Sequence, residues 1–363
     1  MSIFDDVGNP HYSGGGPVVV HEVATRLARR YRVVVLSASY KGSKSQWRDG
    51  VRYLFLPVGW AGPRAGQVVF QFLLPLVALV LRHDLWIETT PPPFSSSLLP
   101  LVSRKPVIAL VQMLSAADMA RRYKLPFQLL ERIGLKLYRH FIVLNEVDRS
   151  AVRRHNRTAT CALIPNGADR PELDERELGG GDHVLFLGRI DVEQKGLDLL
   201  LSAVSRHRPA LPLIIAGSGA KREERKLRQL AARAGAQVTV LGRVGGRQKE
   251  DLLRTCACVV VPSRYETFSL SALEAMTYGK PIVCFDLPQL GWISADCAVR
   301  VPPFDVAGMG QALQHLAADP VHRANLGRRG RSLSRDYDWD VLAERYRDVV
   351  QAVLGNTRQD SAP

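Results

Sequence analysis

Short apolar segments alternate with amphipathic helical segments along almost the whole chain. In the helical segments apolar residues recur with a helical period, as at Val20, Val23, Ala24 and Leu27. The apolar segments are rich in Val, Ile and Leu and occupy residues 32–38, 51–57, 85–90, 106–111, 141–145, 161–165, 183–188, 211–216, 237–241, 258–262 and 281–285. Strands that alternate with helices form parallel sheets covered by helices on their faces. The sequence therefore predicts an α/β protein.

At 363 residues the chain is too long for one ordinary hydrophobic core, so we expect two domains. The segment before residue 183 is rich in Gly, Pro and charge, which is typical of a linker. We predict a first domain at 1–168, a hinge at 169–182, a second domain at 183–337, and a C-terminal helix with its tail at 338–363 that packs back across the junction. Only Ile3 and Phe4 precede the acidic pair at 5–6. Either the first strand is very short, or the true start lies upstream.

The chain has a formal net charge of +14, which is concentrated in the first half. Residues 1–165 contain 22 Lys and Arg against 10 Asp and Glu, whereas the remainder contains 27 against 25. Such an asymmetry indicates that the first half faces an anionic partner. Nucleic acid, an anionic membrane surface and a phosphorylated acceptor all fit the charge alone.

The longest apolar run, from Val68 to Leu81, contains Gln71 and Pro75 and is shorter than the ~20 residues that a membrane-spanning helix needs. It predicts a buried or interfacial helix. No secretory signal is visible, and five cysteines, an odd number, favour reduced thiols in a cytoplasm. We therefore expect a cytoplasmic protein.

Two glycine-containing turns each lie between a predicted strand and a predicted helix. Gly14–Gly16 precede a helix with Pro17 in its first turn, where proline is tolerated because that amide has no helical partner. Residues 216–219 form the second turn and include Gly217. Glycine lets the backbone approach a ligand, and a helix N-terminus offers free amides to an anion. A phosphate site and a simple tight turn are both consistent with these segments.

Two cations flank a third turn. Arg189 follows a predicted strand, and Lys195 lies just before the next helix. In α/β sheets ligands bind at the carboxyl ends of the strands. Two cations there can bind a diphosphate and stabilise it as a leaving group, although a solvated surface pair is the alternative.

The segment 262–276 carries two glutamates eight residues apart. Glu266 lies in a loop after a predicted strand and Glu274 lies in the next helix. Ser271 and Glu274 have the S-x-x-E spacing of a capping box, which would explain Glu274 structurally. A carboxylate accepts hydrogen bonds from sugar or ribose hydroxyls, and free helix-start amides donate to oxygens. The amides in question belong to Phe268, Ser269 and Leu270. The segment therefore suits a polyhydroxylated, anionic ligand.

Together these segments resemble the donor site of family 4 glycosyltransferases of GT-B fold. The resemblance rests on G-R at 188–189, K-G at 195–196, the E-x7-E segment and G-K-P at 279–281. The glycine run at 14–16 and the I-P-N-G stretch at 164–167 also resemble that family, so the match extends over nearly the whole chain. It implies two facing Rossmann-like domains with parallel sheets and a cleft between them.

The resemblance implies a retaining hexosyltransferase that moves a sugar from a nucleotide-diphosphate sugar to the hydroxyl of a glycan, lipid-linked or small-molecule acceptor. Arg189 and Lys195 would hold the diphosphate, and Glu266 would contact the transferred sugar. We assign catalytic roles to these three. Glu274 would bind the ribose hydroxyls. The further donor-binding residues would be Gly15, Gly16, Gly217, Phe268, Ser269 and Leu270.

Such enzymes need neither cofactor nor metal, because the cations replace the metal. The D-x-D pattern at Asp336, Asp338 and Asp340 lies beside a predicted helix, where cap and surface roles explain it. The chain departs from the family at Gln112, where many members carry a histidine near the reacting sugar. Gln112 carries no proton at neutral pH, but it can hydrogen-bond a sugar or acceptor hydroxyl. Retention needs no protein nucleophile if the leaving diphosphate takes the acceptor proton on the same face.

Three alternatives remain from the sequence. Another GT-B enzyme, such as a sugar epimerase or a phosphorylase, would share the donor motifs. A catalytically inactive relative would explain Gln112. A nucleic-acid-binding protein would explain the basic charge, but no helix-turn-helix, zinc or RNA-binding signature accompanies it, so we expect no nucleic-acid partner.

The resemblance also implies that the first domain supplies most of the acceptor site, often for acceptors at the cytoplasmic membrane face. Cationic and apolar residues lie side by side in the sequence at Arg121, Arg122, Lys124, Leu125, Pro126 and Phe127. Such a segment could rest on an anionic bilayer as a peripheral contact, and a solvated basic surface is the alternative.

Overall fold

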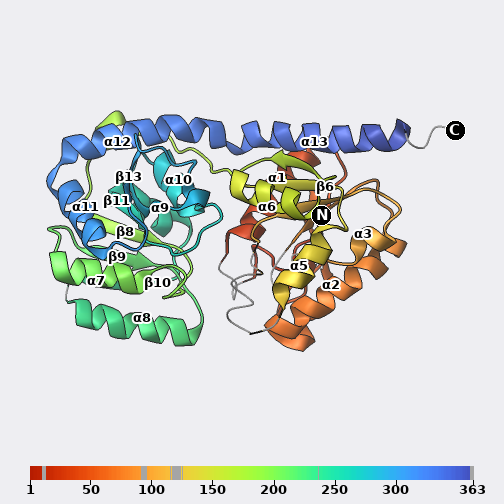
Figure 1. Cartoon of the computed structure of the whole chain (residues 1–363), viewed down its shortest axis with the longest axis horizontal. Helices are drawn as coiled ribbons and strands as arrows, with labels where there is room; N and C mark the ends of the chain where they lie inside the picture. Colours follow the sequence, from red (N-terminus) through yellow and green to blue (C-terminus); the bar gives the residue numbers. More distant parts are fainter. Residues whose placement is uncertain are drawn as a thin grey trace. The chain divides into compact units, whose positions relative to one another are not determined.

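The computed structural model describes residues 1–9, 14–90, 96–114, 116, 124, 126–235 and 237–359. These residues form two compact units. The first unit combines residues 1–166 with residues 339–363, and the second comprises residues 167–338. Figure 1 shows the chain coloured along the sequence and labels many of its helices and strands.

The described elements of the first unit follow in chain order. They are α1 (Gly15–Ala28), β1 (Val34–Ala38), β2 (Gln46–Arg48), β3 (Val51–Leu56), η1 (Gly59–Ala61), α2 (Gly62–Val80), β4 (Trp86–Thr89), α3 (Leu99–Val102), β5 (Val107–Val111), α5 (Phe127–Leu135), β6 (His140–Val143), α6 (Glu146–His155), β7 (Thr160–Leu163) and α13 (Trp339–Gln359). The strands pair in the orders β1-β3-β2 and β4-β5-β6-β7. All of these pairings are parallel except that of β2, which runs antiparallel to β3.

The N-terminal segment joins these two groups of strands. Ser2 forms parallel bridges with Leu36 of β1 and with Glu88 of β4. Its amide donates to the Ile87 carbonyl at 3.0 Å, and its carbonyl accepts from the Thr89 amide at 2.9 Å. The first strand is therefore very short and lies in the middle of the sheet, so the chain after it leaves near the sheet's centre.

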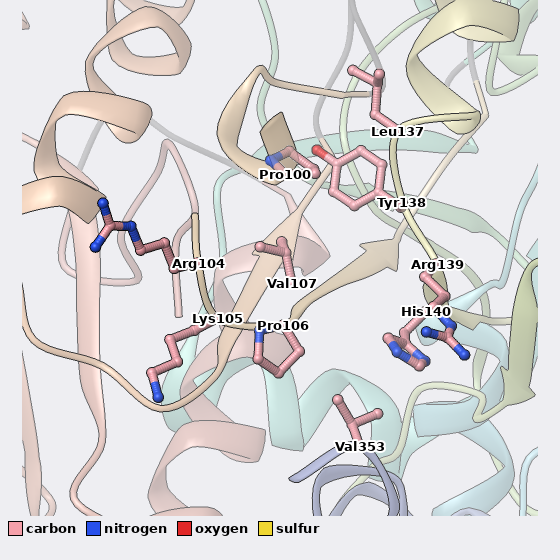
Figure 2. Close-up of a pocket in the computed structure, with 10 residues that line it drawn as sticks. All are labelled: Pro100, Arg104, Lys105, Pro106, Val107, Leu137, Tyr138, Arg139, His140 and Val353. Carbon is pink, nitrogen blue, oxygen red and sulfur yellow. The ribbon is translucent and has the colours of Figure 1, made fainter. Parts of the chain in front are cut away.

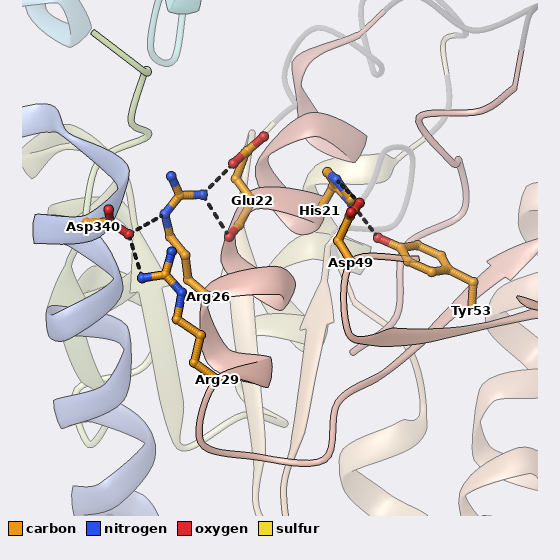
Figure 3. Close-up of polar contacts among 7 residues, drawn as sticks. All are labelled: His21, Glu22, Arg26, Arg29, Asp49, Tyr53 and Asp340. Atoms are coloured by element: carbon orange, nitrogen blue, oxygen red, sulfur yellow. Dashed lines mark hydrogen bonds and ion pairs between the residues drawn. The ribbon is translucent and has the colours of Figure 1, made fainter. Parts of the chain in front are cut away.

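The C-terminal helix belongs to the first unit. Its apolar residues recur with a helical period, and the buried ones are Trp339, Leu342, Ala343, Tyr346, Val350 and Val353. The helix packs against α1. At this contact the Oδ1 atom of Asp340 accepts from Arg26 Nε and Arg29 Nη1, both at 3.0 Å (Figure 3). The last aspartate of the D-x-D pattern thus holds two helices together.

Glu88 is a buried carboxyl group on β4. Its Oε2 atom accepts from Ser97 Oγ at 3.0 Å and from the Tyr138 hydroxyl at 2.9 Å. Burial raises the pKa of Glu88 to about 7, although the two hydrogen bonds oppose this shift. A carboxyl group whose pKa is raised by folding favours the folded state below its unfolded pKa of 4.5. That contribution is lost as the pH rises through about 7.

We therefore expect Glu88→Gln to become increasingly more stable than wild type between pH 5 and pH 8. The glutamine oxygen accepts the same two hydrogen bonds without a buried charge, and the gain reaches at most ~3 kcal/mol. Urea unfolding of both proteins across this pH range measures the difference. A difference between the two unfolding free energies that stays constant across this pH range would contradict the assignment. Ser45→Ala, a change of an exposed neutral polar side chain in the same unit, serves as the control.

The second unit is built around one six-stranded sheet in which every pairing is parallel. Its order is β10-β9-β8-β11-β12-β13. The described elements are η2 (Glu175–Glu177), β8 (His183–Leu187), α7 (Leu197–His207), β9 (Leu213–Ala216), α8 (Lys221–Ala234), β10 (Val238–Gly242), α9 (Gly246–Thr255), β11 (Cys256–Val261), α10 (Leu270–Thr277), β12 (Ile282–Phe285), η3 (Pro288–Leu290), β13 (Ala298–Val301), α11 (Val306–Ala318), α12 (Pro320–Leu333) and η4 (Ser334–Tyr337). Both units are thus parallel, helix-covered α/β structures of the kind predicted.

The segment that we expected to be a hinge, 169–182, lies within the second unit. Leu173 packs against that unit's core, and the buried Arg323 donates from Nε to the Gly179 carbonyl at 2.9 Å. The chain instead passes between the units at residues 166–167 and again at 338–339. Glycine and charge content indicates a turn-rich segment, but it does not show which core that segment packs against.

The apolar run at 68–81 lies in α2, as a helix of mixed exposure. Phe70 and Leu74 are buried against the core of the first unit, whereas Phe72, Leu76 and Leu79 are 62%, 58% and 67% exposed. Among the described residues no helix is both long and apolar enough to cross a membrane. The helix thus carries a second, exposed apolar stripe, as an interfacial helix does.

Candidate functional site

The cationic turn and the first glutamate follow adjacent strands at the middle of the second sheet. From β8 the chain continues to β9 on one side, and β11 lies on the other side of β8. The order therefore reverses between β8 and β11. A crevice at such a reversal, outside the carboxyl ends of the strands, is where α/β sheets bind ligands. Arg189 and Lys195 follow β8, and Glu266 follows β11.

Lys195 and Glu266 form an ion pair at this edge. The Nζ atom of Lys195 lies 2.5 Å from Glu266 Oε1, and the two side chains are 18% and 9% exposed. Ser263 Oγ donates to the same carboxylate oxygen at 2.8 Å. A lysine ammonium has three donors, so it can keep Glu266 and also donate to a phosphate oxygen. The carboxylate is thereby held beside the group predicted to bind the diphosphate.

Arg264 connects the loop after β11 to the loop after β8. Its amide donates to the Gln194 carbonyl at 2.9 Å, and its guanidinium forms two 2.7 Å hydrogen bonds with Asp198 of α7. Gly196 has a φ of 63°, and a Cβ there would lie 1.8 Å from the Pro262 carbonyl oxygen. This close approach brings Lys195 to Glu266. The sequence reasoning missed Arg264, because only the R-x-E spacing with Glu266 hinted at it.

Arg189 lies near the start of the loop between β8 and α7. Its side chain is 43% exposed, and Nη2 donates to Gln194 Oε1 at 2.6 Å. Asp191 Oδ2 lies 3.9 Å from Nη1. The guanidinium is therefore accessible on the same loop as Lys195, which is consistent with a second contact to a diphosphate.

Gly217 lies next to Gly188, at the ends of neighbouring strands. Its φ is 153°, and a Cβ at this position would lie 1.7 Å from the Gly188 carbonyl oxygen. Its amide donates to the Gly242 carbonyl at 2.7 Å, so this amide is already engaged. Gly217 therefore contributes to the region by its missing side chain, which lets two turns pack together, rather than through a free N–H group.

The helix α10 starts beside Glu266. Ser269 is its N-cap and accepts from the Ala272 amide at 3.3 Å, so the predicted capping box of Ser271 and Glu274 is wrong. The spacing was right for a box, but the helix begins two residues earlier than that box requires. Within the described chain no hydrogen bond engages the amides of Phe268, Ser269 and Leu270. They can therefore donate to an anion.

Glu274 instead pairs with a neighbouring helix. Its Oε1 atom lies 2.7 Å from Lys249 Nζ of α9, and the side chains are 27% and 35% exposed. The carboxylate is thus oriented by a lysine and remains accessible to a ligand hydroxyl.

We expect Glu274→Gln to raise the donor KM about tenfold with a smaller effect on kcat, because a neutral amide accepts a ribose hydroxyl more weakly than a carboxylate. Steady-state kinetics measure this effect, and a lowered kcat at unchanged KM would contradict the ribose role.

Ser269 and not Ser271 caps the helix. Ser269→Ala should therefore cost ~1 kcal/mol of unfolding free energy, and Ser271→Ala should cost less. Thermal melting of the two variants measures the difference.

An aromatic cluster lies behind the start of α10. The ring centroids of Phe268 and Trp292 are 4.5 Å apart and nearly parallel, and Tyr337 lies 5.1 Å from Trp292. These rings hold the loop that carries the free amides. Trp292 and Tyr337 could not be identified from the sequence, because nothing in their local pattern connects them to residue 268.

The glycine run in the first unit lies at the start of α1. Gly14 is the N-cap of α1, which starts at Gly15, and no side chain caps it. The helix follows the short central strand of that sheet. Gln112 follows β5, and Asn166 Nδ2 donates to its Oε1 at 3.4 Å. Its Nε2 atom is buried without a partner among the described residues, so it has a free donor for a hydroxyl group.

No cluster of three or more His, Cys, Asp or Glu that could hold a metal occurs among the residues that the structure describes. All five cysteines are free, and Cys256 and Cys258 are buried on β11. The assembled groups are thus cations, carboxylates and helix amides, which suit a ligand with both phosphates and hydroxyls.

Two family models match the chain. The model of glycosyltransferase family 4 matches residues 13–171, and the model of glycosyl transferases group 1 matches residues 181–319. Over 215 residues the chain is 32% identical to a glycogen synthase of Mycobacterium tuberculosis, covering 55% of this chain and 50% of that protein. Over 206 residues it is 32% identical to a phosphatidyl-myo-inositol mannosyltransferase of Mycolicibacterium smegmatis, covering 53% and 52%. The match thus spans about half the length of each curated relative.

A solved structure extends the similarity to nearly the whole chain. The sucrose-phosphate synthase of Thermosynechococcus elongatus superposes with a TM-score of 0.82 at 20% identity, covering 98% of this chain and 99% of that chain. This likeness confirms the predicted GT-B fold with two Rossmann-like domains. With one family model on each half and the donor motifs placed at the strand reversal, the chain belongs to the family 4 glycosyltransferases.

Proposed function

We propose that the protein is a retaining glycosyltransferase that moves a sugar from a nucleotide-diphosphate sugar to an acceptor hydroxyl. The observation that carries the proposal is the Lys195–Glu266 pair at the strand reversal, 2.5 Å apart and beside unengaged helix amides. A cation next to a carboxylate matches the point in the donor where the phosphate meets the sugar. Family membership supports the same reaction.

In this proposal Lys195 and Arg189 neutralise the diphosphate as the bond between the anomeric carbon and the phosphate oxygen breaks. The acceptor oxygen forms the new bond to the anomeric carbon on the same face, and its proton passes to the leaving diphosphate. Glu266 accepts hydrogen bonds from hydroxyls of the transferred sugar, and Glu274 accepts those of the ribose. Because the cations take up the developing charge, the role of the protein is mainly electrostatic.

The acceptor is a glycan, a lipid-linked sugar or a small molecule. Gln112 is the candidate contact in the first unit, since its buried Nε2 atom has no partner among the described residues. An amide donates to a hydroxyl but does not carry a proton at neutral pH. We therefore assign Gln112 a positioning role for an acceptor or sugar hydroxyl rather than acid–base chemistry.

The test is a panel of nucleotide sugars in a thermal-shift assay, followed by an assay of nucleoside diphosphate release. A true donor at 100 Kd stabilises the fold by ~2.7 kcal/mol. Release only in the presence of an acceptor supports transfer. Product without nucleoside diphosphate release would indicate an epimerase, and phosphate-dependent cleavage of a glycan would indicate a phosphorylase. Binding of a donor without turnover of any acceptor would support an inactive relative.

We also propose a peripheral contact with the anionic cytoplasmic face of a membrane. Of the segment first considered, Arg121, Arg122 and Leu125 lie outside the described residues, and Phe127 is only 7% exposed, so it cannot rest on a bilayer. In this proposal the apolar contact with the bilayer is made instead by the exposed stripe of α2, which consists of Phe72, Leu76 and Leu79. The basic excess of the first half provides the attraction to anionic lipid.

Binding to vesicles that contain anionic lipid is expected to be clear at low salt and largely lost at high salt, because the attraction decays within about 8 Å at physiological ionic strength. Replacing Phe72, Leu76 and Leu79 with Ser should weaken it without changing donor binding. Val321→Ser, which alters an equally exposed apolar residue of the second unit, is the control. Equal binding to neutral and anionic vesicles would contradict the electrostatic attraction, and no binding at low salt would leave only a soluble acceptor.

A further inference from the structure

Each glutamate of the E-x7-E segment is paired with a lysine from another element. Glu266 is paired with Lys195, and Glu274 is paired with Lys249 of α9. The first pair matches the point in the donor where the phosphate meets the sugar. Lys249 is the member of this set that the proposed reaction leaves without a role of its own.

The cations around the hollow of the first unit do not converge in this way. That hollow, of about 310 Å³, lies beside the starts of β5 and β6. Arg104 and Lys105 lie on one side of it and Arg139 on the other, with their charged ends pointing apart (Figure 2). By contrast, the Nζ atom of Lys249 lies 2.7 Å from Glu274 Oε1, so the two groups can contact the same part of a ligand.

Both side chains of the Lys249–Glu274 pair lean toward the edge where the donor binds. Lys249 lies in the first turn of α9, and Glu274 lies in the second turn of α10. Each of these helices follows a strand, so its N-terminus lies at the carboxyl edge of the sheet. In an α-helix the Cα–Cβ bonds tilt toward the N-terminus. A Cβ at Gly245 or Gly246 would meet nothing within 4 Å, so space is open beside this end of α9.

The pair leaves both a hydrogen-bond donor and an acceptor available to a ligand. Lys249 has three N–H donors, and one of them is engaged with Glu274 Oε1. Among the residues that the structure describes, nothing else engages the other two donors or the Oε2 atom of Glu274. The side chains are 35% and 27% exposed, so a ligand can reach them. A donor beside an acceptor matches two neighbouring hydroxyl groups, of which one accepts and the other donates.

The pair is also electrically neutral. An unpaired carboxylate at this edge would repel a diphosphate held by Arg189 and Lys195, because like charges repel at short range. Lys249 cancels the charge of Glu274 and leaves the lone pairs of its second oxygen available. The pair therefore suits a neutral diol better than it suits a further phosphate group.

We propose that Lys249 and Glu274 together recognise the 2′ and 3′ hydroxyls of the donor's ribose, with Lys249 donating to one oxygen and Glu274 accepting from the other hydroxyl. Lys249 is then a specificity-determining residue, and the donor is a sugar diphosphate of a ribonucleoside rather than of a deoxyribonucleoside. A deoxy donor would leave one of the two charged groups without its contact. The inference rests on the proposed function, since it requires a nucleotide-diphosphate donor at this edge.

Isothermal titration calorimetry of the full chain provides the test. UDP, GDP and ADP are compared first, and the tightest of them is then compared with its 2′-deoxy and 3′-deoxy forms. Each deoxy form is expected to bind about tenfold more weakly, the usual effect of losing a hydrogen bond to a charged group. Lys249→Met should remove this discrimination at one of the two hydroxyls and leave it at the other. Lys249→Arg, which keeps a cationic donor, should largely retain both.

Lys226→Met is the matched control, because Lys226 is an exposed lysine of α8 in the same unit, and it should leave both affinity ratios unchanged. If Lys249→Met also leaves both ratios at their wild-type values, the pair only ties α9 to α10, and the inference is wrong while the proposed function stands. Equal binding of the ribose and deoxy forms by the wild type would overturn it as well. If none of the three ribonucleoside diphosphates binds, the proposed function fails too. Melting curves confirm that the variants are folded.

Discussion

Lys195→Ala is expected to lower kcat/KM about 100-fold, the usual cost of removing one charge-stabilising contact from a transition state. Arg189→Ala should have an effect of similar size, since both cations face the same leaving group in the proposed reaction. Steady-state kinetics with a nucleotide sugar measure the loss. Activity is expected to persist in EDTA, and an enzyme that loses activity on chelation and recovers with manganese would contradict the role of the cations.

Lys195 also neutralises Glu266, so its two roles must be separated. Removing the lysine leaves a carboxylate that is 9% exposed without its cation, which should cost ~2 kcal/mol of unfolding free energy. Glu266→Gln breaks the same ion pair but removes no phosphate contact. Lys195→Ala should therefore weaken binding of a nucleoside diphosphate strongly, and Glu266→Gln should leave it nearly unchanged. Equal losses in both variants would show that the ion pair only shapes the loop.

Gly217→Ala is expected to destabilise the second unit by more than ~4 kcal/mol, a large fraction of the stability of an ordinary domain. A Cβ at residue 217 would lie 1.7 Å from the Gly188 carbonyl oxygen, and the main chain on both sides is hydrogen-bonded. The Gly188 amide donates to Ala216, and the Gly217 amide donates to Gly242. Neither turn can move aside without breaking these bonds. Thermal and urea unfolding measure the effect.

The matched control is Gly245→Ala. Gly245 has an extended φ of −168°, and a Cβ there would meet nothing within 4 Å. Because Gly245 is the N-cap of α9, where glycine is preferred to alanine, the unfolding free energy of this variant should fall by no more than ~1 kcal/mol. If Gly217→Ala melted normally and lost donor binding, the glycine would contact the donor directly and the packing explanation would be wrong.

The sequence alone determined most of the secondary structure and the location of the donor motifs. Each of the eleven apolar segments overlaps a strand, because most of these strands are buried in parallel sheets and therefore need a nearly continuous apolar run. The edge strands β2 and β13 were not predicted, because edge positions tolerate polar residues such as Gln46 and Arg300. The turns at Gly188 and Gly217 were visible because close backbone approach selects glycine locally.

Only the tertiary structure decided which side chains meet. Lys195 and Glu266 are 71 residues apart, and their contact depends on β8 and β11 being neighbours, which no local pattern specifies. The same holds for Lys249 with Glu274 and for Arg264 with Asp198. The capping box failed because Ser269 and Ser271 can each cap a helix, and the S-x-x-E spacing pointed to Ser271 whereas the helix begins after Ser269. Local chemistry thus identified the candidate residues, and strand order, a property of the whole sheet, paired them.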